Sequence, residues 1–85
     1  MPYIEIEQRE LINCHQIQPS TAGQLNYKIH LLLEQYTKTK GVSYQTYNDM
    51  IGALEAAKLE LYRRAISEYE DKKIVENGDI NFYEN

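Results

Sequence analysis

The chain has 85 residues, enough for one domain that buries only about 60 to 65% of its unfolded surface, so a second copy would help to complete a core. Nine Lys and Arg against thirteen Asp and Glu give a net charge of -4, which disfavours a surface that binds duplex DNA. Cys14 is the single cysteine, so an intramolecular disulfide is excluded and a reducing, cytoplasmic setting is expected.

The first segment, residues 1–18, is predicted to be an extended arm followed by a weak helix. Ile4 and Ile6 alternate with glutamates, as in an extended strand, and Leu11 and Ile12 then fit a helix. Neither an export signal nor a membrane span is expected, because the amino terminus is acidic and the longest apolar run is Leu31–Leu33.

The second segment is predicted to be a helix over residues 21–38. Thr21 and Gln24 have the spacing of a capping box at its start, and Gly41 after two lysines is typical of a helix stop. An apolar stripe at helical spacing predicts its core-facing side; the stripe consists of Leu25, Ile29, Leu32, Leu33 and Tyr36.

The third segment, residues 44–75, is predicted to be one long helix, because it follows an N-capping Ser43 and contains no proline and a single glycine. One stripe is formed by Tyr47, Ile51, Leu54, Leu61 and Ala65, and small residues beside it are Gly52, Ala53, Ala56 and Ala57. Small side chains allow close helix approach, so this helix is expected to pair with another helix, within the protomer or between protomers.

Residues 76–85 are predicted to be a turn and tail, with Gly78 ending the helix and Ile80–Tyr83 forming a short strand that could pair with Tyr3–Ile6. The predicted fold is therefore all-α: a single domain, 1–85, built as a small bundle of two to three helices. It has one long C-terminal helix and short extended termini, and it is expected to be a homo-oligomer.

Acidic pairs spaced three apart are the one pattern typical of an enzyme. Helical nucleoside-triphosphate pyrophosphatases hold magnesium with such pairs, and the pairs here are Glu7 with Glu10, Glu68 with Asp71, and Glu76 with Asp79. The first pair lies far from the others in sequence and the last straddles a turn, so solvated surface charge explains them better. We expect no enzyme, no cofactor and no metal site.

The strongest candidate for ligand binding is the stretch "KLELYRR", which places Lys58, Tyr62, Arg63 and Arg64 close together. Lys58 and Tyr62 are one helical turn apart and could hold an anion and stack a ring. The ordinary alternative is surface ion pairing of Glu55 with Lys58, Glu60 with Arg64 and Arg64 with Glu68, worth tenths of a kcal/mol each.

The segments "LNYKIHLLL" and "SYQTYNDMIGALEAAKLELYRRAISEYEDKKIVENGDINFY" resemble a family of small uncharacterised proteins of phages and some bacteria. The resemblance covers residues 25–83, and the tract "ALEAAKLELYRR…YEDKKIVENGD" is its most specific part. It implies no established activity and a phage setting, hence the cytoplasm of a host cell. Phages encode small proteins that neutralise host defences by sequestering nucleotide signals or by blocking a host protein.

The leading functional hypothesis is a non-enzymatic oligomeric protein that sequesters a small anionic, nucleotide-like immune signal. Lys58, Arg63 and Arg64 would neutralise phosphate, and Tyr27, Tyr47 or Tyr62 would stack a base. The alternative is a protein-interaction module whose long helix binds and inhibits a host or phage protein. A metal-dependent pyrophosphatase is the weaker third hypothesis.

Overall fold

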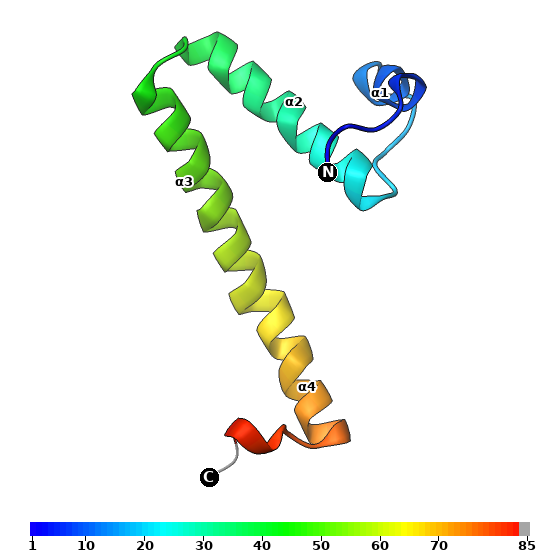
Figure 1. The fold of residues 1–85 in the computed structure, drawn as a ribbon, viewed down its shortest axis with the longest axis vertical. Coiled ribbons are helices and arrows are strands. Elements are labelled where there is room, and N and C mark those ends of the chain that lie inside the picture. The colour runs from blue at the N-terminus through cyan, green and yellow to red at the C-terminus, as the bar shows by residue number, and fades with distance from the viewer. Residues whose placement is uncertain (84–85) are drawn as a thin grey trace. The chain divides into compact units, whose positions relative to one another are not determined.

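The computed structural model describes residues 1–83 of the chain, and every regular element in this part is helical (Figure 1). The all-α prediction and the long C-terminal helix are confirmed. The elements in chain order are α1 (Ile6–Asn13), α2 (Ala22–Lys40), α3 (Tyr44–Leu61), a π-helical turn (Tyr62–Ile66), α4 (Ser67–Asn77) and a 3-10 turn (Asn81–Tyr83). The chain divides into two compact units, Met1–Tyr47 and Asn48–Asn85, and the boundary falls inside α3.

The first unit is held together by packing of α1 on α2. Ile12 of α1 is only 1% exposed and is the one fully buried apolar side chain in the described part of the chain. The arm before α1 crosses the start of α2 at Gly23, where an added Cβ would lie 3.0 Å from Ile4 Cγ2 and 3.1 Å from the Met1 carbonyl oxygen. Glycine at this position therefore permits the close approach of the arm.

Helix α2 begins and ends as its sequence predicts. The Gln24 backbone N–H donates to Thr21 Oγ1 at 3.1 Å, which is the first half of a capping box. The second half differs, because Gln24 Oε1 accepts from the Ser20 backbone N–H at 2.9 Å, one residue before the cap. At the other end Gly41 has φ +85° and donates its N–H to the Thr37 carbonyl at 2.7 Å.

The predicted core stripe of α2 is only partly buried. Leu25 is 54% exposed and Leu32 is 57% exposed, whereas Gln24 is buried. The prediction that this face is core is therefore wrong for these leucines, because α1 is eight residues long and covers only a small part of α2. Apolar spacing indicates which side of a helix is available for packing, but the length of the partner decides how much of it is covered.

The carboxyl-terminal strand predicted from the sequence is replaced by a helical turn, whereas residues 1–5 form an arm without regular secondary structure. Ile6 already belongs to α1, and Asn81–Tyr83 is a 3-10 turn, so the suggested strand pairing is wrong. Alternating apolar residues over four positions fit the start of an amphipathic helix as well as a strand, which explains the error. Residues 84 and 85 of the predicted tail lie outside the described part. No helix within residues 1–83 is both long and apolar enough to cross a membrane.

The second unit begins within α3, which Ser43 caps with its hydroxyl by accepting the Thr46 backbone N–H at 3.0 Å. The helix ends at Gly78, which has φ +83° and donates its N–H to the Ile74 carbonyl at 2.8 Å. With ψ at 153°, this backbone conformation is essentially restricted to glycine. Steric crowding does not exclude a side chain at residue 78, because an added Cβ would meet nothing within 4 Å.

We expect Gly78→Ala to destabilise this end of the helix by about 1 to 3 kcal/mol, which is the cost of forcing a side chain into a glycine-only conformation. Gly52→Ala is the matched control: a Cβ at Gly52 also meets nothing within 4 Å, but its φ is helical. This control should stabilise the helix by up to about 1 kcal/mol. Thermal unfolding followed by far-UV circular dichroism measures both, and equal melting of the two variants would refute the cap.

Candidate functional site

The predicted cationic cluster lies on the exposed surface of the long helix, and each cation is paired with a glutamate of the same helix. Lys58 Nζ lies 3.6 Å from Glu55 Oε1. Arg63 Nη2 and Arg64 Nη1 both contact Glu60 Oε1, at 2.9 and 3.6 Å. The predicted pairs of Glu55 with Lys58 and Glu60 with Arg64 are thus present.

The aromatic side chains assigned to the same site are separated between the two units. Tyr62 donates its hydroxyl to the Glu70 carboxylate at 3.4 Å, within the helix of the cationic cluster. Tyr47 is 48% exposed in the first unit. Tyr27, also in the first unit, donates its hydroxyl to Asn13 Oδ1 at 2.8 Å, and the Arg9 guanidinium lies 5.9 Å from its ring centre. The second unit by itself therefore brings only Tyr62 to the cations.

The π-turn is the feature of this helix that sequence periodicity did not predict. The Ser67 backbone N–H donates to the Tyr62 carbonyl, a bond between residues five apart instead of four. Such a turn inserts one extra residue and rotates everything after it by roughly 100° relative to a regular helix. The hydrogen bond from Tyr62 to Glu70 fits this rotation, because it aligns two residues that are eight apart.

The rotation aligns apolar side chains on the two sides of the π-turn. In a regular helix Leu61 and Ile66 would lie about 140° apart. Across the π-turn the same five residues complete a little more than one turn, so Ile66 returns to within roughly 50° of Leu61. Tyr69 follows three residues later on the same side. We call the resulting face the apolar seam; its members are Ile51, Leu54, Leu61, Ile66 and Tyr69.

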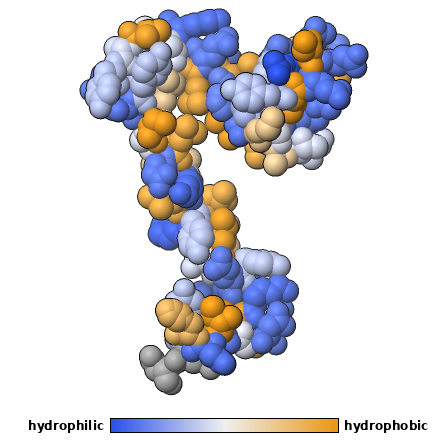
Figure 2. Space-filling model, in the orientation of Figure 1, coloured by the Kyte–Doolittle hydropathy of each residue, from blue (hydrophilic) through white to orange (hydrophobic). Residues whose placement is uncertain are grey.

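The apolar seam is uncovered in the second unit. Its members are exposed by 66% at Ile51, 37% at Leu54, 59% at Leu61, 38% at Ile66 and 61% at Tyr69. Figure 2 shows hydrophobic surface along the long helix, interleaved with hydrophilic residues. The stripe predicted from the sequence contains the first three members; it misses Ile66 and Tyr69 because it assumes a regular helix. Ile66 and Tyr69 are three residues apart, as on one helix face, but they do not fall at regular helical spacing from Leu61. This break in the spacing is the sequence signal that could have revealed them.

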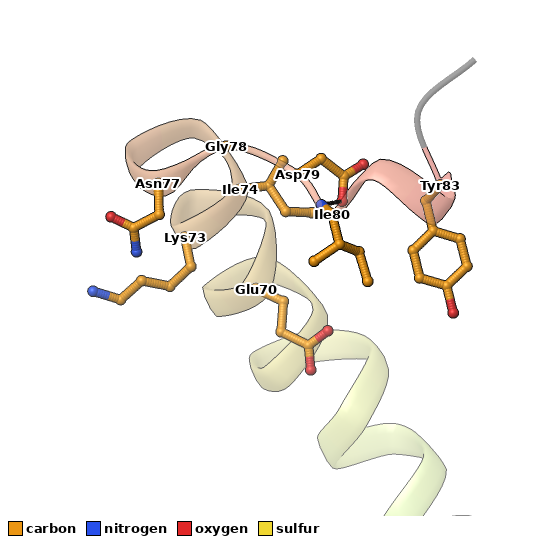
Figure 3. A pocket seen from close by; sticks show the side chains of 8 residues that line it. All are labelled: Glu70, Lys73, Ile74, Asn77, Gly78, Asp79, Ile80 and Tyr83. Carbon is orange, nitrogen blue, oxygen red and sulfur yellow. Dashed lines mark hydrogen bonds between the residues drawn. The ribbon is translucent and has the colours of Figure 1, made fainter.

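A surface hollow lies where the chain turns after α4 (Figure 3). Its volume is about 410 Å³. Ile74, Ile80 and Tyr83 supply apolar lining, and the Ile80 backbone N–H is bonded to Asp79 Oδ1 at 2.8 Å. Glu70 reaches it from the preceding turns of α4. The lining residues are exposed or half-buried, so this hollow is a shallow surface feature without enclosed polar groups.

The acidic pairs considered for magnesium do not gather into a ligand set in the described structure. Among residues 1–83, no three His, Cys, Asp or Glu side chains lie close enough together to hold a metal ion. Glu68 and Glu76 instead pair with lysines of α4, Lys72 at 3.9 Å and Lys73 at 3.1 Å. These contacts are typical of a solvated helix face.

The hypothesis that the cationic cluster clamps a nucleotide-like anion can be tested directly. A phosphate bound there would have to compete with Glu60 for Arg63 and Arg64. If the cluster binds a nucleotide, Arg63→Ala should weaken binding about tenfold or more, since a charge-assisted contact is worth roughly 1.5 to 3 kcal/mol. Glu60→Gln should strengthen it, because both guanidinium groups lose their competitor. Calorimetry with cyclic and linear nucleotides measures both. The clamp is wrong if no nucleotide binds the wild type or if both variants leave the affinity unchanged.

No curated protein and no solved structure matches the sequence. A family model described as a domain of unknown function, DUF6899, matches residues 1–80, which is nearly the whole chain. The protein therefore belongs to the DUF6899 family.

Proposed function

We propose that this protein is a non-enzymatic protein-interaction module that self-associates through the apolar seam of its long helix. The observation that supports this function is the uncovered seam itself, in which five large apolar side chains stay between 37% and 66% exposed. An apolar face of this kind on a small protein marks a surface that binds another protein. Partner binding would remove these side chains from water.

The size of the seam suits a dimer. Taking about 200 Å² for each fully exposed large side chain, the seam and the adjacent Tyr62 would bury roughly 600 to 700 Å² per copy. A stable interface of standard size buries about 800 Å² per partner. The alanines beside the seam and the methylene groups of its flanking lysines would supply much of the difference. A second copy of the helix therefore offers enough area.

The charges of the helix favour a partner of the same composition over a highly charged ligand. Lys58, Arg63 and Arg64 are already paired with Glu55 and Glu60 on their own helix, so these three cations and two carboxylates leave only one net positive charge. A strongly acidic or basic partner would gain little from such a surface. A second copy would contribute the same nearly neutral flanks and the same apolar side chains, so the two surfaces would be complementary.

We expect Leu61→Glu to weaken self-association by at least about tenfold, because a carboxylate in the seam must lose water without gaining a partner. Leu59→Glu is the matched control: Leu59 is 57% exposed and Leu61 is 59% exposed, but Leu59 lies well away from the seam. Sedimentation equilibrium of the wild type and both variants measures the difference. A monomeric wild type at micromolar concentration, or equal effects of the two substitutions, would contradict the proposal.

A further inference from the structure

Resting on the proposed self-association, we infer that two copies pair their long helices antiparallel, with the two-fold axis at the π-turn beside Arg64. A row of alternating charges runs along one flank of the seam. The π-turn lies at the centre of that row.

The charged row consists of Glu55, Lys58, Glu70 and Lys73. The Glu55–Lys58 ion pair joins its first two members at 3.6 Å. Tyr62, one turn after Lys58, donates its hydroxyl to Glu70 at 3.4 Å and thereby connects the two halves of the row across the π-turn. Lys73 is one turn after Glu70 and lies 5.6 Å from the ring centre of Tyr69, a member of the seam. These contacts place all four charges along the same side of the helix.

When two copies of this row run in opposite directions, each charge of one row lies opposite a charge of the other sign. Read towards the carboxyl end, the row is negative, positive, negative, positive. Glu55 and Lys73 lie equally far from Arg64, and so do Lys58 and Glu70. An antiparallel pair centred on Arg64 therefore brings Lys58 of one copy opposite Glu70 of the other, and Glu55 opposite Lys73. The two-fold axis repeats each pair, so four oppositely charged contacts flank the seam.

A parallel pair lacks this complementarity. In a parallel pair the charged flank of one copy lies beside the opposite flank of the other, so the row does not meet its own reverse. The antiparallel arrangement also places the π-turns of both copies side by side, because Tyr62–Ile66 is centred on Arg64. Ile66 of one copy then lies opposite Tyr62 of the other, near the centre of the interface.

Charge exchange tests the pairing directly. Lys58→Glu and Glu70→Lys should each weaken self-association about tenfold, because each replaces two attractive contacts with two repulsive ones. An equimolar mixture of the two variants should recover association as a heterodimer, since one variant then carries only carboxylates at these two positions and the other only ammonium groups. Glu68→Lys is the matched control: the same charge change two residues away, off the charged row, should leave association unchanged. Failure of the mixture to recover association would overturn the pairing.

Spin-label distances separate the inference from the proposed function on which it rests. Labels would be attached at Arg64→Cys and at Val75→Cys, each in a Cys14→Ser background. In an antiparallel pair the two labels at residue 64 lie near the two-fold axis, whereas the two labels at residue 75 lie on opposite sides of it. At 1.5 Å of rise per residue in each helix, the two labels at residue 75 are therefore separated by about 33 Å more along the helix axis. Equal distances at the two positions in a dimer would overturn the antiparallel inference and leave self-association standing. Absence of any intermolecular distance would overturn both.

Discussion

The phase of a helix depends on every residue in it, because each residue turns the chain by about 100°. One extra residue in the π-turn therefore decides which side chains of α4 share a face with those of α3. Without it, Glu68 and Lys72 would follow Leu61 along the apolar stripe, and the stripe would end there. With it, Ile66 and Tyr69 follow Leu61. The apolar seam, its flanking charges and the proposed pairing all depend on this rotation.

A second constraint is the small amount of apolar surface that the chain buries by itself. Ile12 is the one fully buried apolar side chain among residues 1–83, and hydrophobic burial is the main favourable contribution to folding. Isolated helices are marginal in water unless tertiary packing supports them. Association through the seam would add that support to the long helix. It would also explain why a π-turn, which weakens local hydrogen bonding, is tolerated at its centre.

Much of the fold could be predicted from local sequence signals. The caps at Thr21 and Ser43 and the stop at Gly78 are present because hydroxyl acceptors and glycine satisfy local backbone requirements, whatever the rest of the chain does. The π-turn could not be predicted in the same way, since no residue type in Tyr62–Ile66 demands a bond between residues five apart. In a regular helix, the only kind that periodicity describes, Ile66 and Tyr69 would lie off the stripe.

Within the candidate site, the regular geometry of a helix also decides which contacts the sequence predicts. Neighbours within one helix turn, such as Glu55 with Lys58, follow directly from helix geometry. Contacts that cross the π-turn, such as that of Tyr62 with Glu70, do not. Whether an exposed cation serves a ligand or a neighbouring glutamate depends on what else surrounds it, which a single sequence does not contain. Tyr27 and Tyr47 could be chosen as aromatic, but their placement in the first unit required the structure.

The most direct measurement of the central claim is sedimentation equilibrium of two single-residue deletions. Deleting Arg64 removes the extra residue of the π-turn, so Leu61, Ile66 and Tyr69 stay aligned in a regular helix. Deleting Ala56 rotates Ile51 and Leu54 by about 100° away from the rest of the seam. The account predicts that the protein lacking Arg64 self-associates like the wild type and that the protein lacking Ala56 dissociates. Loss of association in both proteins, or in the protein lacking Arg64 alone, would contradict it.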